Sequence, residues 1–138
     1  MVTVKSVRRI GAAALVVPTG DHLLGPTLGM IFAPTLMTTV FGAGAEAAVV
    51  FFIVLGIFQL AWIPILLKSS NRGLLTLGIL GNLVSIIIYF VSLSGVTIFG
   101  VPPQNGGAFA ILIKALEFLF VLASIHVMTR ATTNPTIR

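Results

Sequence analysis

Residues 46–94 read EAAVVFFIVLGIFQLAWIPILL, then KSSNR, then GLLTLGILGNLVSIIIYFVSLS. Each of the two apolar runs is close to the roughly 20 residues that an α-helix needs to cross the hydrocarbon core of a bilayer. The five polar residues between them, Lys68 to Arg72, are typical of a turn. The stretch therefore predicts two transmembrane helices joined by a short loop.

The rest of the chain repeats this pattern. Apolar segments lie near 8–32, 46–67, 73–94 and 108–129, with turn residues at 42–44 and 102–107. We expect an all-α fold, a four-helix transmembrane bundle that uses residues 1–138 as one integral membrane domain. Pro18 and Pro26 each remove a helical hydrogen bond, so the first helix should be kinked or broken.

The composition agrees with a lipid environment. Hydrophobic residues make up 57% of the chain and charged residues 8%, against roughly 25% charged in a soluble domain. The mean hydropathy is +1.15. The net charge of +5 comes from basic residues that are scattered singly, so it does not indicate nucleic-acid binding. Because Cys is absent, disulfides and thiolate metal sites are excluded.

The basic residues predict the orientation. Three precede the first segment, two lie between the second and third, and two follow the fourth: Lys5, Arg8, Arg9, Lys68, Arg72, Arg130 and Arg138. The other two loops contain no Lys or Arg. Since Lys and Arg concentrate on the cytoplasmic side, we expect both termini in the cytoplasm (N-in, C-in) and a multi-pass protein of the cell membrane, in contact with the lipid bilayer.

Polar residues recur at one depth within the apolar segments. Counting about 1.5 Å per residue from the basic edge places them near the middle of the bilayer. The predicted intramembrane cluster consists of Asp21, His22, Gln59, Asn82, Lys114 and Glu117. In the third segment, Gly78, Gly81, Asn82, Ser85, Tyr89 and Ser92 share one helical face, a pattern typical of helix–helix contact.

Two interpretations of this cluster stay open. Charges at such depth are usually paired and face the bundle interior; Lys114 can pair with Glu117, and Asp21 with Lys114 or His22. The cluster is then either a neutralised clasp that fixes helix packing, or a proton relay, metal site or ligand site. No G-x-S-x-G or H-E-x-x-H motif is present, so we expect no catalytic residues, no bound metal and no cofactor.

Four segments carry a resemblance to known proteins: Asp21-His22-Leu23-Leu24-Gly25-Pro26, Phe52-x-x-x-Gly56-x-x-Gln59, Gly78-x-x-Gly81-Asn82, and Glu117. With these the chain resembles small four-span membrane proteins of archaea and actinobacteria. Some archaeal members are similar to accessory subunits of the copper-dependent ammonia monooxygenase. The resemblance implies a helical subunit that supplies no copper ligands.

Two functional hypotheses follow. The first is a non-catalytic accessory or structural subunit of a larger energy-converting membrane complex, such as an ammonia monooxygenase, with other integral membrane subunits as partners. Short loops and helix faces rich in small residues favour it. The alternative is a small proton-coupled transporter or intramembrane ligand-binding bundle that uses Asp21, His22 and Glu117.

Overall fold

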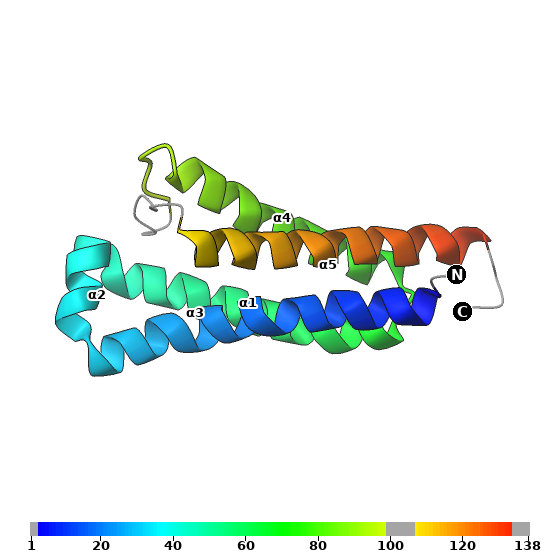
Figure 1. The fold of residues 1–138 in the computed structure, drawn as a ribbon, viewed down its shortest axis with the longest axis horizontal. Helices are drawn as coiled ribbons and strands as arrows, with labels where there is room; N and C mark the ends of the chain where they lie inside the picture. The colour runs from blue at the N-terminus through cyan, green and yellow to red at the C-terminus, as the bar shows by residue number, and fades with distance from the viewer. Residues whose placement is uncertain (1–2, 99–106, 134–138) are drawn as a thin grey trace.

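The computed structural model describes residues 3–98 and 107–133, and this part of the chain is helical apart from short connections (Figure 1). The elements are α1 (Val4–Phe32), α2 (Pro34–Phe41), a 3₁₀ turn (Gly42–Gly44), α3 (Ala45–Lys68), α4 (Arg72–Ser92) and α5 (Ala108–Thr133). The all-α prediction is confirmed. The predicted turn at 102–107 lies almost wholly outside the described residues.

Local sequence signals explain the helix boundaries. The side chain of Thr3 accepts a hydrogen bond from the backbone N–H of Ser6 at the start of α1. Asn71 does the same for Leu74 at the start of α4, at 3.1 Å. Such N-caps satisfy backbone donors that have no partner inside the helix. The N-cap of α4 lies in the run of polar residues that predicts this boundary, whereas α1 begins four residues before the first predicted segment.

Of the two outcomes expected for the first segment, a break is wrong and a kink stays a prediction. The α1 helix runs without interruption through Pro18 and Pro26, and the chain leaves the helix only at Ala33, before Pro34 begins α2. A helix satisfies its own backbone groups, which lipid cannot do, so transmembrane helices tolerate internal prolines. At Ala33 the following proline disfavours the helical conformation of the residue before it.

Three described helices are long and apolar enough to cross a membrane: α3, α4, and α5 over Ala108–Arg130. The chain is thus a helical membrane protein with three apolar candidate spans. The α1 helix is not among the three; it carries Asp21, His22 and two prolines, which lower its hydropathy. It packs along both α3 and α5 (Figure 1). Large apolar side chains such as Val54, Leu80 and Leu122 point outward, where they suit lipid.

The small residues predicted at helix contacts are used inside the bundle. Gly78 and Gly81 of α4 lie directly against Trp62 and Phe58 of α3, leaving no room for a Cβ atom. A Cβ on Gly56 would lie 2.6 Å from Leu23 Cγ. These glycines therefore let α1, α3 and α4 approach closely, as small residues do in membrane bundles.

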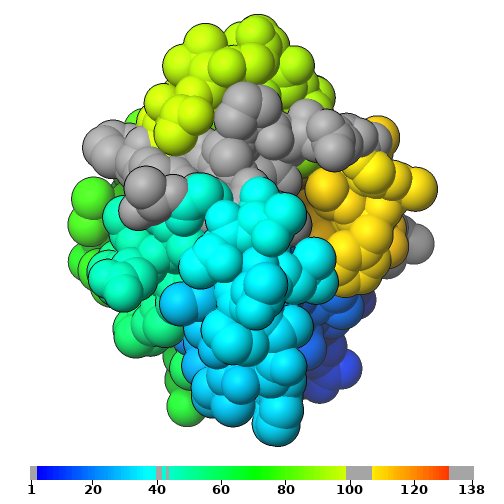
Figure 2. Space-filling model, turned by 90° about the vertical axis from the view of Figure 1, so that its left-hand side faces the viewer, coloured from blue at the N-terminus to red at the C-terminus, as the bar shows by residue number. Residues whose placement is uncertain are grey.

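The two ends of the bundle differ in composition. The start of α1 and the end of α5 lie at one end, and α2 lies at the other (Figure 1). Figure 2 looks onto the α2 end, with α2 in front and the first turns of α5 beside it. An apolar core occupies the end with the termini: Leu15, Leu66, Leu75, Phe120, Val121, Ala123 and Val127.

Arg8 closes the bundle beside this core. Its Nη1 atom donates to the carbonyl oxygens of Leu66, at 2.8 Å, and Ser69, at 2.5 Å, and its Nη2 atom donates to Ser70 Oγ at 2.7 Å. The last carbonyls of a helix have no partner within that helix. Arg8, which the sequence presents only as one of the basic residues that set orientation, thus ties α1 to the end of α3.

Candidate functional site

The structure brings five of the six residues of the predicted cluster into one buried network. His22 comes from α1, Gln59 from α3, Asn82 from α4, and Lys114 and Glu117 from α5. Lys114 is 9% exposed and the other four are at most 2% exposed. Residues far apart in sequence therefore meet in the interior between four helices.

Gln59 is the centre of this network. Its Nε2 atom donates to Asn82 Oδ1 at 3.1 Å and to Glu117 Oε1 at 2.8 Å. Its Oε1 atom lies 2.9 Å from His22 Nδ1. Because both amide N–H groups are used and a carbonyl oxygen only accepts, the proton of this last bond must come from His22 Nδ1. One side chain thus links four helices and fixes the orientation of the imidazole.

An ion pair forms the second part of the network. Lys114 Nζ lies 2.9 Å from Glu117 Oε2. It also donates to Ser85 Oγ at 2.8 Å, and that hydroxyl donates to the Glu117 carboxylate at 3.1 and 3.2 Å. A charge in lipid is costly unless it is paired and hydrogen-bonded. Here the two charges neutralise each other, and Ser85 bridges them.

Two further groups lie next to the imidazole of His22. Its Nε2 atom lies 3.8 Å from Glu117 Oε1, and its ring stacks on Phe52 with centroids 5.4 Å apart and planes at 19°. The ring therefore has one edge in the polar network and one face against an aromatic wall.

Asp21 is the residue that does not join. It is only partly buried, and among the described residues none forms a hydrogen bond or ion pair with its carboxylate. The expected pairing with Lys114 or His22 is not formed. Neighbouring residues on a helix point about 100° apart, so a chain that turns His22 into the network turns Asp21 out of it.

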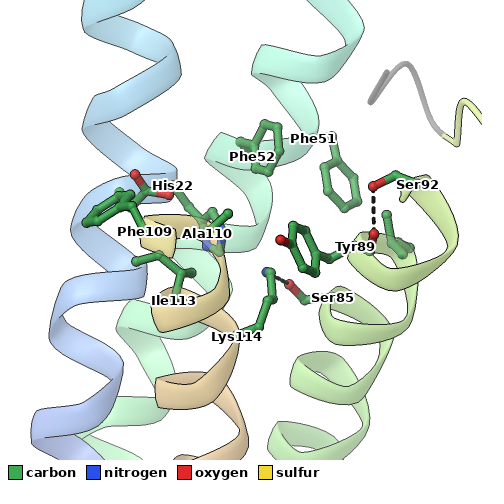
Figure 3. A pocket seen from close by; sticks show the side chains of 12 residues that line it. His22, Phe51, Phe52, Ser85, Tyr89, Ser92, Phe109, Ala110, Ile113 and Lys114 are labelled. Atoms are coloured by element: carbon green, nitrogen blue, oxygen red, sulfur yellow. Dashed lines mark hydrogen bonds between the residues drawn. The ribbon is translucent and has the colours of Figure 1, made fainter. Parts of the chain in front are cut away.

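A cavity of about 110 Å³ adjoins the network on the side away from the termini. Its polar lining comes from Asp21, His22, Ser85, Tyr89, Ser92 and Lys114. Its apolar walls include the rings of Phe51, Phe52 and Phe109. Figure 3 shows these side chains converging from the surrounding helices. Ligand sites in helical bundles have this character, mostly apolar with a few placed polar groups.

Tyr89 gives the cavity an unsatisfied polar group. The residue is 6% exposed, and its hydroxyl has no hydrogen-bond partner among the described residues. Figure 3 shows the hydroxyl directed into the space beside the Lys114 ammonium, whose nitrogen lies 5.8 Å from the centre of the Tyr89 ring. The hydroxyls of Thr19 and Ser124 are also buried and unpartnered, but neither lines this cavity.

Ser85 and Tyr89 are absent from the predicted cluster, although the sequence contains a signal for them. Both lie on the helical face that carries Asn82, at spacings of three and four residues. The pattern predicts a helix-packing face there and does not indicate that these two residues border a cavity. Within residues 3–98 and 107–133 no three His, Asp or Glu side chains are grouped closely enough to hold a metal ion.

Comparisons with protein-family models, with curated protein sequences and with solved structures each return no match to this chain. The resemblance to four-span proteins of archaea and actinobacteria stays a prediction. The network and the cavity are therefore the features that bear on function.

Proposed function

We propose that this protein is an intramembrane ligand-binding bundle of four spans, with both termini in the cytoplasm, that holds a small molecule in the cavity beside Tyr89 and Lys114. The observation that carries the proposal is the buried Tyr89 hydroxyl, which faces a cavity and has no partner among the described residues. Leaving such a group unsatisfied costs about 1–3 kcal/mol. A bound molecule that accepts its hydrogen bond removes this cost.

A purely structural role explains the network but not the cavity. The network satisfies Gln59, Glu117 and Ser85 without any contribution from the cavity. Packing alone favours a phenylalanine at position 89 and a filled space above the ion pair, because interiors leave few voids larger than a water molecule. The combination of aromatic walls, a phenol and an ammonium at one small cavity supports binding.

The fourth span is α1. It has 29 residues, enough to cross the hydrocarbon core, and it turns His22 into the bundle. Basic residues occupy the first two turns of α1 and flank the loop between α3 and α4, at Lys68 and Arg72, which supports N-in topology. The chain has no Cys, so single cysteines report the side directly. A membrane-impermeant maleimide should label Ser94→Cys from outside intact cells and leave Lys5→Cys unlabelled; outside labelling of Lys5→Cys refutes the fourth span.

The proposal is tested by filling the cavity. Ala110 lines it, whereas Ala115 on the same helix points outward. Purified in a mild detergent and extracted with organic solvent, the wild-type chain should release a small molecule in stoichiometric amount, detected by mass spectrometry. Ala110→Phe should lose this molecule and Ala115→Phe should retain it. Equal content in all three proteins argues against a ligand in the cavity.

The two other hypotheses from the sequence stay predictions. Glycines of α3 and α4 lie against large side chains of neighbouring helices inside the bundle, so they no longer favour an accessory subunit. Co-migration of the native protein with other membrane subunits on a native gel supports that role, and migration alone argues against it. For proton-coupled transport, Asp21→Asn and Glu117→Gln should abolish pH-dependent uptake; uptake unchanged in both variants removes the hypothesis.

A further inference from the structure

From the donors, charges and walls of the cavity we infer the chemical class of its ligand: a neutral molecule with a carbonyl-type oxygen on a flat apolar body. This inference rests on the proposed function. The oxygen accepts hydrogen bonds from Tyr89 and Lys114, and the apolar body lies among the phenylalanine rings.

Two hydrogen-bond donors at the cavity are not bonded to any acceptor among the described residues. A lysine ammonium has three N–H groups, and Lys114 uses two of them, on Ser85 and Glu117. The third has no acceptor among the described residues. The Tyr89 O–H is likewise unused. Both groups line the same cavity, and the ammonium nitrogen lies 5.8 Å from the centre of the phenol ring, so a ligand in the cavity can meet both donors.

The acceptors already present do not bond to these donors. The Asp21 carboxylate lines the same cavity, but it forms no hydrogen bond or ion pair with Tyr89 or Lys114. The Ser85 hydroxyl accepts from Lys114 and donates to Glu117, and the Gln59 carbonyl oxygen accepts from His22. The Glu117 carboxylate does not line the cavity. Near Tyr89, hydrogen-bond donors therefore border the cavity. An electron-rich oxygen can accept from them.

The charged groups at and beside the cavity favour a neutral ligand. The Lys114 ammonium is balanced by Glu117 at 2.9 Å, so an anionic ligand adds an unpaired charge inside the bundle, which is costly in a membrane. Asp21 on the same cavity repels an anion as well. A cationic ligand can pair with the Asp21 carboxylate, but an ammonium group has no lone pair that could accept a hydrogen bond from Tyr89 or Lys114. A neutral acceptor satisfies both donors without adding a charge.

The phenylalanine rings that line the cavity favour a ligand with a flat apolar part. Phe52 stacks on His22, and Phe51 meets Phe52 edge to face, with centroids 5.4 Å apart and planes at 71°. Phe109 lies on the α5 side of the cavity. Aromatic rings in offset or edge-to-face contact gain more than area burial alone. A planar ring therefore packs here better than a branched aliphatic body.

Four matched probes test this class: acetophenone, ethylbenzene, benzoate and benzylammonium. Each is equilibrated by dialysis with nanodiscs that contain the wild-type chain, and nanodiscs with Ala110→Phe serve as the blank for partitioning into lipid. Acetophenone should be retained above the blank, and the other three should be retained at least tenfold more weakly. Preference for benzoate or for benzylammonium overturns the inferred class but leaves a ligand-binding bundle in place.

A second comparison isolates the hydroxyl. Tyr89→Phe keeps the ring and should weaken acetophenone binding about tenfold, the size of one lost hydrogen bond. Thr19→Val removes another buried, unpartnered hydroxyl that does not line the cavity, and should leave binding unchanged. Equal binding by Tyr89→Phe and wild type overturns the inference. If no probe binds while solvent extraction releases a molecule, the class is wrong; if extraction also yields nothing, the proposed function fails.

Discussion

The two ends of this bundle differ in how their interiors are filled. At the end with the termini, Leu15, Leu66 and Phe120 fill the interior and are fully buried, and Arg8 binds the final carbonyls of α3. Toward the α2 end, the same four helices enclose an ion pair, a hydrogen-bonded amide and a cavity with an unpartnered phenol. One half is closed by packing and the other retains unmet hydrogen-bonding capacity.

The apolar core and the cavity thus lie at different positions along the bundle axis. Lipid supplies no hydrophobic drive to bring helices together, so close packing and interhelical hydrogen bonds must hold them. The apolar half supplies the packing, and the network supplies the bonds. Among the polar groups that line the cavity, the Tyr89 hydroxyl takes part in none of these bonds.

The largest effect is expected at the ion pair. Glu117→Leu leaves the Lys114 ammonium buried without a counter-charge, which costs about 3–5 kcal/mol. The measurement is the free energy of unfolding in mixed micelles. Lys114→Met combined with Glu117→Leu removes both charges and should recover most of the loss. A double variant as unstable as the single one indicates that the bonds to Ser85 and Gln59, not the charges, hold the helices.

A smaller effect is expected at the end with the termini. Arg8→Met removes three charge-assisted hydrogen bonds to the end of α3 and should lower the unfolding free energy by about 2 kcal/mol. Arg9→Met, at the exposed neighbouring position, is the matched control and should change it by less than about 0.5 kcal/mol. Similar losses in both variants show that Arg8 acts through net charge and not through these bonds.

The third prediction concerns which nitrogen of His22 carries the proton, and it involves no change in stability. The hydrogen bonds of Gln59 require the His22 proton at Nδ1. Nitrogen NMR of the labelled protein should show a one-bond N–H coupling at Nδ1 of His22, with His126→Gln used to assign the signal. A proton found only on Nε2 means that the Gln59 amide is reversed, and that Glu117 and Asn82 do not accept from it.

Much of the architecture was predictable because lipid imposes strong rules. Run lengths and flanking charges place α3 and α4 within two residues of their observed ends. The depth of Gln59, Asn82 and Glu117 indicated a polar layer before any contact was known. Continuity of α1 through Pro18 was not predictable from local propensity, because the helix is retained by its surroundings and not by that residue.

The cavity was not predictable, for a different reason. Tyr89 and Ser85 share a face with Asn82, and the sequence does not distinguish a residue that fills a seam from one that borders a void. That distinction depends on how far the ends of α4 and α5 separate, which no residue type encodes. The choice between Asp21 and His22 has the same origin, since it depends on the rotation of α1 in the bundle.

The position of Gln59 also bears on how the protein is made. Synthesis proceeds from α1 to α5, so His22, Gln59 and Asn82 are translated before Glu117. Until α5 packs against the other helices, the Gln59 amide can donate to Asn82 but lacks its second acceptor, the Glu117 carboxylate. The network is therefore complete only when α5 is in place, and a truncation before α5 leaves one N–H group of Gln59 without its partner.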